Sequence, residues 1–157
     1  MRRDYFTLEA RNLEWVEEDD PPRRPTVHID FQGPETDLRE GFTRSDGTLL
    51  DAGETDVTFR LQADPDEEDD ARGVVAVTNR ITGDFIFEIN VAAADVFRFI
   101  DAARRFADET EDGSRYRVEL YLDGVEYVTY EKDTFLVYTR DGELMRSRSL
   151  IPGGVEL

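Results

Sequence analysis

The stretch VVAVTNRITGDFIFEINVAAADVFRFIDAARRFAD, residues 74–108, decides the fold class because its hydrophobic period changes along its length. Residues 74–90 form two runs rich in β-branched and aromatic residues with Thr82-Gly83 between them, which predicts a β-hairpin. From Val91 to about Asp108 the apolar residues recur with the 3.6-residue period of an amphipathic helix. We expect Asn90 to be the N-cap of this helix. The chain is therefore predicted to combine strands with one long helix.

Further strands are predicted on both sides of this stretch. Their sequences alternate between apolar and polar residues, which is typical of half-buried strands. The segment 33–47 is ambiguous, and a short helix starting within Thr36–Glu40 is one interpretation. The predicted strands and hairpins lie within residues 5–16, 26–31, 56–62, 116–130 and 134–148.

Two of these segments contain an Asp-Gly pair, which is the strongest short-range signal for a hairpin. Asp123-Gly124 fits a type I′ turn, and Asp141-Gly142 predicts a second hairpin. With a regular two-residue loop at the first turn, the expected pairs are Leu122 with Val125, Leu120 with Tyr127, and Val118 with Thr129.

Together these elements predict a single α+β domain over residues 1–157. It should be mostly antiparallel, with about eight strands in hairpins and one long helix packed on the sheet. An acidic loop is expected at 63–72 and an extended C-terminal tail at 149–157.

The charge balance is strongly acidic. Asp and Glu number 37 against 19 Lys and Arg, which gives a formal net charge of −18, and Lys132 is the only lysine. Such a charge destabilises a compact chain through self-repulsion unless salt screens it. Aromatic residues nevertheless make up 11% of the chain, which is unlike a disordered acidic protein. We interpret the composition as that of a folded, halophilic protein, and counterions such as K⁺ and Na⁺ are its expected partners.

The acidic loop ADPDEEDDAR, residues 63–72, is the most conspicuous candidate for a metal site. Aligned as an EF-hand, it supplies Asp64, Asp66 and Glu68, but Asp69 and Val75 occupy the positions that require Gly and Glu. A solvated loop is therefore the main interpretation, and weak binding of Ca²⁺ or Mg²⁺ is the alternative.

The usual catalytic motifs are missing. The chain contains no cysteine and a single histidine, His28, which we expect on the polar face of a strand. Neither G-x-S-x-G nor a glycine-rich phosphate loop occurs. We therefore predict no catalytic, cofactor or metal residues, and no nucleic-acid partner, because the arginines form small islands among carboxylates.

Spare aromatic and apolar residues are the remaining candidates for function. Phe97 falls toward the polar side of the predicted helix, and Tyr121, Val128 and Tyr130 fall on the hairpin face opposite Leu120. If a second layer covers that face they belong to the core. If it does not, these four residues form an interaction surface for a protein partner or a second copy.

Four segments resemble a family of small haloarchaeal proteins catalogued as a domain of unknown function. They are MRRDYFTLEARNLEWV (1–16), VTNRITGDFIFEIN (77–90), YEKDTFLVY (130–138) and SLIPGGVEL (149–157). The resemblance implies a salt-rich archaeal cytoplasm and no catalytic residues.

Three functional hypotheses follow. The first is a non-enzymatic domain acting through protein contacts or self-association. The alternatives are a small-molecule or divalent-metal-dependent enzyme with a site of scattered Asp, Glu, Arg and Tyr, and a nucleic-acid mimic that binds a basic partner. The opening MRRDYFTLEA is unlike a secretory signal, and no run approaches the roughly 18 apolar residues of a membrane span. We therefore expect a cytoplasmic protein that does not contact a membrane.

Overall fold

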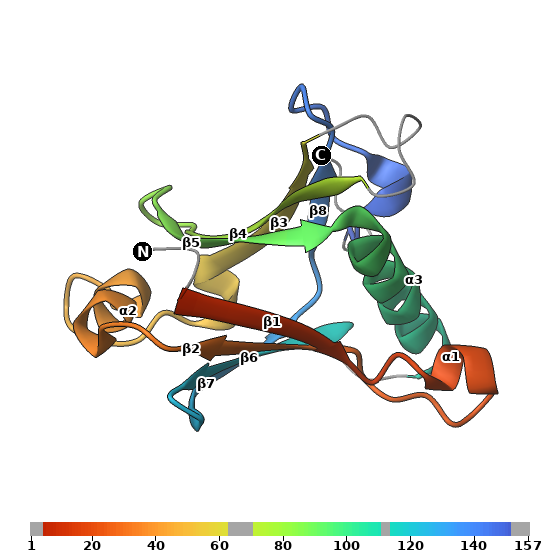
Figure 1. Ribbon diagram of the computed structural model, residues 1–157, viewed down its shortest axis with the longest axis horizontal. Coiled ribbons are helices and arrows are strands. Elements are labelled where there is room, and N and C mark those ends of the chain that lie inside the picture. Colours follow the sequence, from red (N-terminus) through yellow and green to blue (C-terminus); the bar gives the residue numbers. More distant parts are fainter. Residues whose placement is uncertain (1–4, 63–70, 111–113, 152–157) are drawn as a thin grey trace.

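Eight strands form two four-stranded sheets that face each other in the computed structural model, which describes residues 5–62, 71–110 and 114–151 (Figure 1). Sheet I has the order β1-β2-β6-β7 and sheet II the order β5-β4-β3-β8. The strands of sheet I are β1 Phe6–Arg11, β2 Thr26–Phe31, β6 Tyr116–Leu122 and β7 Val125–Lys132. Those of sheet II are β3 Thr55–Leu61, β4 Arg72–Asn79, β5 Phe85–Ala92 and β8 Leu136–Tyr138.

The predicted α+β class, with mostly antiparallel strands and one long helix, is confirmed. The expectation that every strand belongs to a hairpin is wrong, because β2 pairs parallel with β6 and β3 pairs parallel with β8. Parallel neighbours require a long crossover, so no local turn signal marks these two pairings in the sequence.

The hairpin predicted at Asp141-Gly142 is reduced to a single bridge between Tyr138 and Leu144. The Ser149 hydroxyl accepts a hydrogen bond from the Val137 N–H at 2.8 Å. In a regular hairpin, a carbonyl of the second strand would be the acceptor. The chain instead turns into the short 3₁₀ segment η3, Arg146–Arg148. Of the tail predicted at 149–157, the structure describes only residues 149–151. Within this part, Leu150 forms an antiparallel bridge with Phe135.

The β6–β7 hairpin turns at Asp123 and Gly124, which have φ values of 49° and 84° as a type I′ turn requires. Its register, however, shifts between Leu120 and Tyr121. Leu122 pairs with Val125 as predicted, but Leu120 pairs with Val128 and Val118 with Tyr130, so the other two predicted pairs are wrong. A β-bulge adds one residue to one strand and reverses the faces of every residue beyond it. Val128 and Tyr130 therefore share the inner face of the hairpin with Val118 and Leu120.

The long helix α3 spans Ala93–Glu109, close to the predicted bounds, and buries Val96, Phe99, Ile100, Ala103 and Phe106. Its N-cap is Ala92, which makes no side-chain cap. The Asn90 prediction is wrong because β5 continues through Ala92 and Asn90 pairs with Val74.

The helix was predicted to pack on one face of a single sheet, but it lies beside the space between the two sheets (Figure 1). The Phe99 ring is 5.6 Å from that of Tyr116 in sheet I, and the Phe97 ring is 6.4 Å from that of Phe59 in sheet II. A helix at this place can bury its apolar face against both sheets at once.

The described residues also form two shorter α-helices. The segment that the sequence left ambiguous forms the helix α2, Glu35–Phe42, and α1 spans Trp15–Glu18. Phe42 of α2 lies 6.1 Å from Phe87 of sheet II and 6.2 Å from Tyr130 of sheet I. In Figure 1, α2 and α3 lie at opposite ends of the space between the sheets.

Candidate functional site

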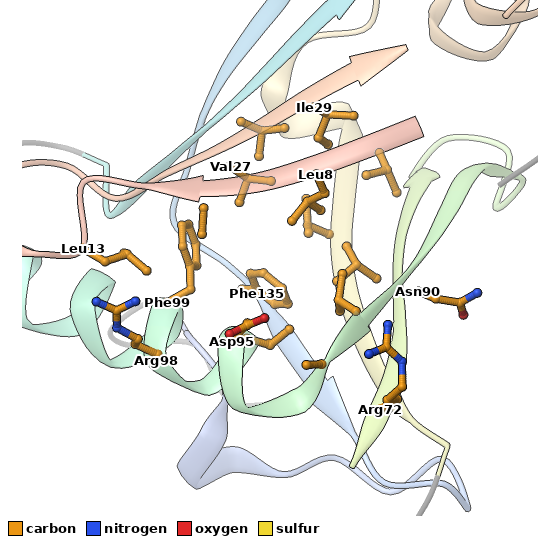
Figure 2. A pocket seen from close by; sticks show the side chains of 18 residues that line it. Leu8, Leu13, Val27, Ile29, Arg72, Asn90, Asp95, Arg98, Phe99 and Phe135 are labelled. Carbon is orange, nitrogen blue, oxygen red and sulfur yellow. The ribbon is translucent and has the colours of Figure 1, made fainter. Parts of the chain in front are cut away.

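A cavity of about 410 Å³ lies between the two sheets, next to α3 (Figure 2). Its interior is formed by buried apolar side chains from both sheets and from the helix. They include Val27 and Ile29 of β2, Val75 and Val77 of β4, and Phe99 of α3. The size and the apolar lining are those of a small-molecule pocket.

The cavity follows from the sizes of the side chains. Facing sheets are about 10 Å apart, and at one end large rings fill this distance, with Phe6 stacked on Phe87 at 4.6 Å. Around the cavity, by contrast, seven of the eighteen lining residues are valines. Short β-branched side chains suit strands but do not reach across the gap, so space remains between them.

The mouth of the cavity is bordered by the edge strands of both sheets and by the first turns of α3. Leu8 of β1 and Val91 of β5 are half-buried there. The polar lining residues are all exposed and comprise Arg72, Asn90, Asp95 and Arg98. In Figure 2, Arg72, Asp95 and Arg98 lie along one border of the cavity, while the amide of Asn90 points away from it.

The charges at the mouth are two guanidinium groups and one carboxylate. Arg98 Nε of α3 lies 3.4 Å from Glu17 Oε1 of α1, and this ion pair connects the two helices. Arg72 makes no ion pair with any residue that the structure describes. Among the charged lining residues the arginines outnumber the carboxylates by two to one, although Glu17 pairs with one of them, on a chain whose formal net charge is −18.

The described lining contains no histidine, serine, threonine, lysine or tyrosine. Nucleophilic catalysis needs a nucleophile next to a base, and acid–base catalysis needs a group poised to move a proton. The described lining residues can bind and orient a molecule, and they contain no pair of a hydroxyl nucleophile and a base.

The four predicted interaction residues do not form one surface. Tyr130 is 7% exposed, and its hydroxyl donates to the Leu50 carbonyl at 2.7 Å. The prediction that Tyr130 lies on the hairpin face opposite Leu120 is therefore wrong, and the bulge in the β6–β7 hairpin is the reason. Val128 is half-buried and also lies on the inner face of the hairpin.

The other two residues are half-buried at separate places. Tyr121 lies on the outer face of sheet I, with its ring 4.5 Å from His28. Phe97 packs near Phe59 and is covered by the Arg148 guanidinium, 4.5 Å from the ring centre. Sequence reasoning missed the mouth of the cavity, because no local pattern links Asp95 to Arg72.

His28 lies on the polar face of β2, as predicted, but Tyr121 covers it and only 7% of it is exposed. Its Nε2 is 3.3 Å from Asp30 Oδ2 and its Nδ1 is 3.4 Å from Glu119 Oε2. No group of three His, Asp or Glu side chains among the described residues is arranged to hold a metal ion. Residues 63–70 of the acidic loop lie outside the described ranges, so the weak metal site stays a prediction.

Lys132, the only lysine, is 7% exposed at the end of β7. Its Nζ donates to the Ala52 carbonyl at 2.6 Å and to the carbonyl and hydroxyl of Thr55. Burial lowers the pKa of Lys132 to about 8, because the charged form loses its hydration. This ammonium group joins β7 of sheet I to the start of β3 in sheet II.

We expect Lys132 to make stability depend on pH. Between pH 8 and its ordinary pKa of 10.5 the folded chain releases the proton first, so the unfolded state binds more protons and stability rises with pH. Relative to Lys132→Met, the wild type should gain about 1–2 kcal/mol between pH 7 and pH 9.5 or so. Urea unfolding of both proteins at the two pH values measures this gain, and the ionisation of tyrosines cancels in the difference. If the free energy of unfolding changes equally with pH in the two proteins, Lys132 is not buried in the way described.

No helix within the described residues is long and apolar enough to cross a membrane. Comparison with the curated proteins and with the solved structures finds no match. One family of sequences does match, and its model covers residues 1–157, the whole chain. The chain therefore belongs to this family of unknown function, DUF5793.

Proposed function

We propose that the protein is a non-enzymatic binding module that holds a small, mainly apolar molecule in the cavity between its sheets. The observation that carries this proposal is the cavity of about 410 Å³ with an apolar interior and an open polar mouth. Binding is a better interpretation than catalysis because the four polar lining residues form no nucleophile–base pair.

The acidic composition and the resemblance to haloarchaeal proteins support a salt-rich cytoplasm as the place where this module works. Several described carboxylates pair with arginine. Arg44, for example, lies 2.9 Å from Asp51 and also contacts Glu54. Arginines placed among the carboxylates are compatible with a surface adapted to salt. A nucleic-acid mimic would instead need a continuous ridge of negative charge.

A series of n-alkanols from butanol to nonanol tests the binding proposal without involving charge. We expect affinity to rise about fourfold per added carbon, because each buried methylene contributes about 0.8 kcal/mol, and to stop rising when the cavity is full. Isothermal titration calorimetry in roughly 2 M KCl, where the charge is well screened, measures the affinities.

Two neighbouring residues of β4 provide matched variants. Val75 lines the cavity, whereas Val74 faces the outer side of sheet II. Val75→Phe should fill the cavity and abolish binding, and Val74→Phe should bind as the wild type does. Circular dichroism verifies that both variants are folded. Equal binding by the two variants, or affinities independent of chain length, would refute the proposal.

Protein contact or self-association is a second candidate function, and it is favoured by two exposed side chains. Ile81 and Phe85, next to the β4–β5 turn, are 63% and 66% exposed. Large apolar residues that are exposed are often part of contact surfaces. Light scattering at ~2 M KCl distinguishes a monomer from a dimer, and Phe85→Asp should dissociate a dimer that uses this surface.

A further inference from the structure

We infer that the natural ligand of the cavity is an alkyl or arylalkyl carboxylate, bound with its apolar part inside and its carboxylate at Arg72. This inference rests on the proposed function and specifies the class of ligand. It follows from where the polar groups lie, from the sign of their charge, and from which of them already has a partner.

The distribution of polar groups sets the direction in which a ligand enters. The buried side chains that line the cavity are all apolar, and the hydrogen-bonding side chains of the lining are all at its mouth. A charged head group inside would lose its hydration without gaining a partner, which is strongly unfavourable. An amphipathic ligand must therefore place its apolar part inside and its head group at the mouth.

The charges at the mouth select an anionic head group. The lining contains Arg72 and Arg98 but only one carboxylate, Asp95, so a cationic head group would meet two like charges. A guanidinium and a carboxylate, by contrast, form two parallel charge-assisted hydrogen bonds. A carboxylate satisfies this geometry while adding only one negative charge to an acidic protein.

Arg72 is the better candidate of the two arginines. Arg98 is 3.4 Å from Glu17, whereas Arg72 makes no ion pair with the described residues. Arg72 is the first residue of β4 and is exposed at the border of the cavity (Figure 2). Its guanidinium can therefore turn toward a carboxylate at the mouth without breaking a described ion pair.

Three probes with the same alkyl chain test the inference: octanoate, octanol and octylammonium, titrated into the full-length protein in ~2 M KCl at about pH 7. We expect octanoate to bind about tenfold more tightly than octanol, since hydrogen bonds to charged groups are stronger than neutral ones. Octylammonium should bind more weakly than octanol.

Variants at the mouth assign the effect to its residue. Arg72→Gln should reduce octanoate affinity to that of octanol and leave octanol binding unchanged, and Arg98→Gln should have a smaller effect. Arg60→Gln is the matched control, because Arg60 lies on the outer face of sheet II, where it donates to the Arg140 carbonyl at 2.8 Å.

The outcomes separate this inference from the proposed function. If octanol and octanoate bind equally and Val75→Phe abolishes both, the carboxylate inference is overturned and the binding module stands. The inference also fails if Arg72→Gln weakens both probes equally or if octylammonium binds most tightly. If none of the probes binds the wild type, the proposed function itself is refuted.

Discussion

Phe31→Ala is expected to lower the free energy of unfolding by about 3–5 kcal/mol, the usual cost of removing a fully buried phenylalanine. Phe31 is 0% exposed at the end of β2, and its ring lies 4.9 Å from Phe6 and 5.9 Å from Tyr5. Phe6 in turn stacks on Phe87 of sheet II. The substitution therefore leaves a void where aromatic rings connect the two sheets. The total free energy of unfolding of a domain is typically about 5–15 kcal/mol, so we expect this variant to lose a large part of its stability.

The measurement is unfolding by urea at constant KCl, since guanidinium chloride would change the ionic strength at the same time. Phe85→Ala is the matched control, because this phenylalanine is 66% exposed. Its effect should stay within about 0.5 kcal/mol, as for most surface substitutions. Similar losses for both variants would contradict the described core.

Transfer from ~0.1 M to ~2 M KCl is expected to raise the melting temperature by about 10 °C or more, at roughly 2–4 °C per kcal/mol for a chain of this size. The reason is the formal net charge of −18. Over this range the Debye length falls from about 10 Å to below about 3 Å, so repulsion between exposed carboxylates is screened. The contribution of the buried core changes much less.

Thermal melts followed by circular dichroism measure the shift. The double variant Glu40→Gln/Asp108→Asn should show a smaller shift, because both carboxylates are exposed near the C-terminal ends of α2 and α3. There they also interact unfavourably with the helix dipole. Melting at the same temperature in both salt concentrations would refute the interpretation of the acidic surface as an adaptation to brine.

Local features could be predicted from the sequence because their causes are local. The 3.6-residue period of residues 91–108 predicted α3, and Asp123-Gly124 predicted a turn whose two φ values are positive. Alternation of apolar and polar residues located most of the strands. Each of these signals depends on residues within about one turn of helix or one hairpin of each other.

The register of the β6–β7 hairpin shows where local reasoning stops. A regular two-residue turn normally determines which residues of the two strands pair. Tyr130, however, lies on the inner face of the hairpin, where its hydroxyl donates a hydrogen bond to the carbonyl of Leu50, 80 residues earlier in the chain. The bulge next to Leu120 accommodates this contact. Its existence depends on a partner that lies far away in the sequence.

By itself, then, the sequence determined the α+β class, the long helix, the hairpin turns and the strongly acidic surface. Only the tertiary structure decided the division into two sheets, the parallel pairs β2–β6 and β3–β8, and the cavity with Arg72 at its mouth. Periodicity and turn dihedral angles arise from neighbouring residues. The order of the strands and the presence of a cavity depend on how side chains far apart in the sequence pack between the two sheets. Here several valines leave part of the space between the sheets unfilled.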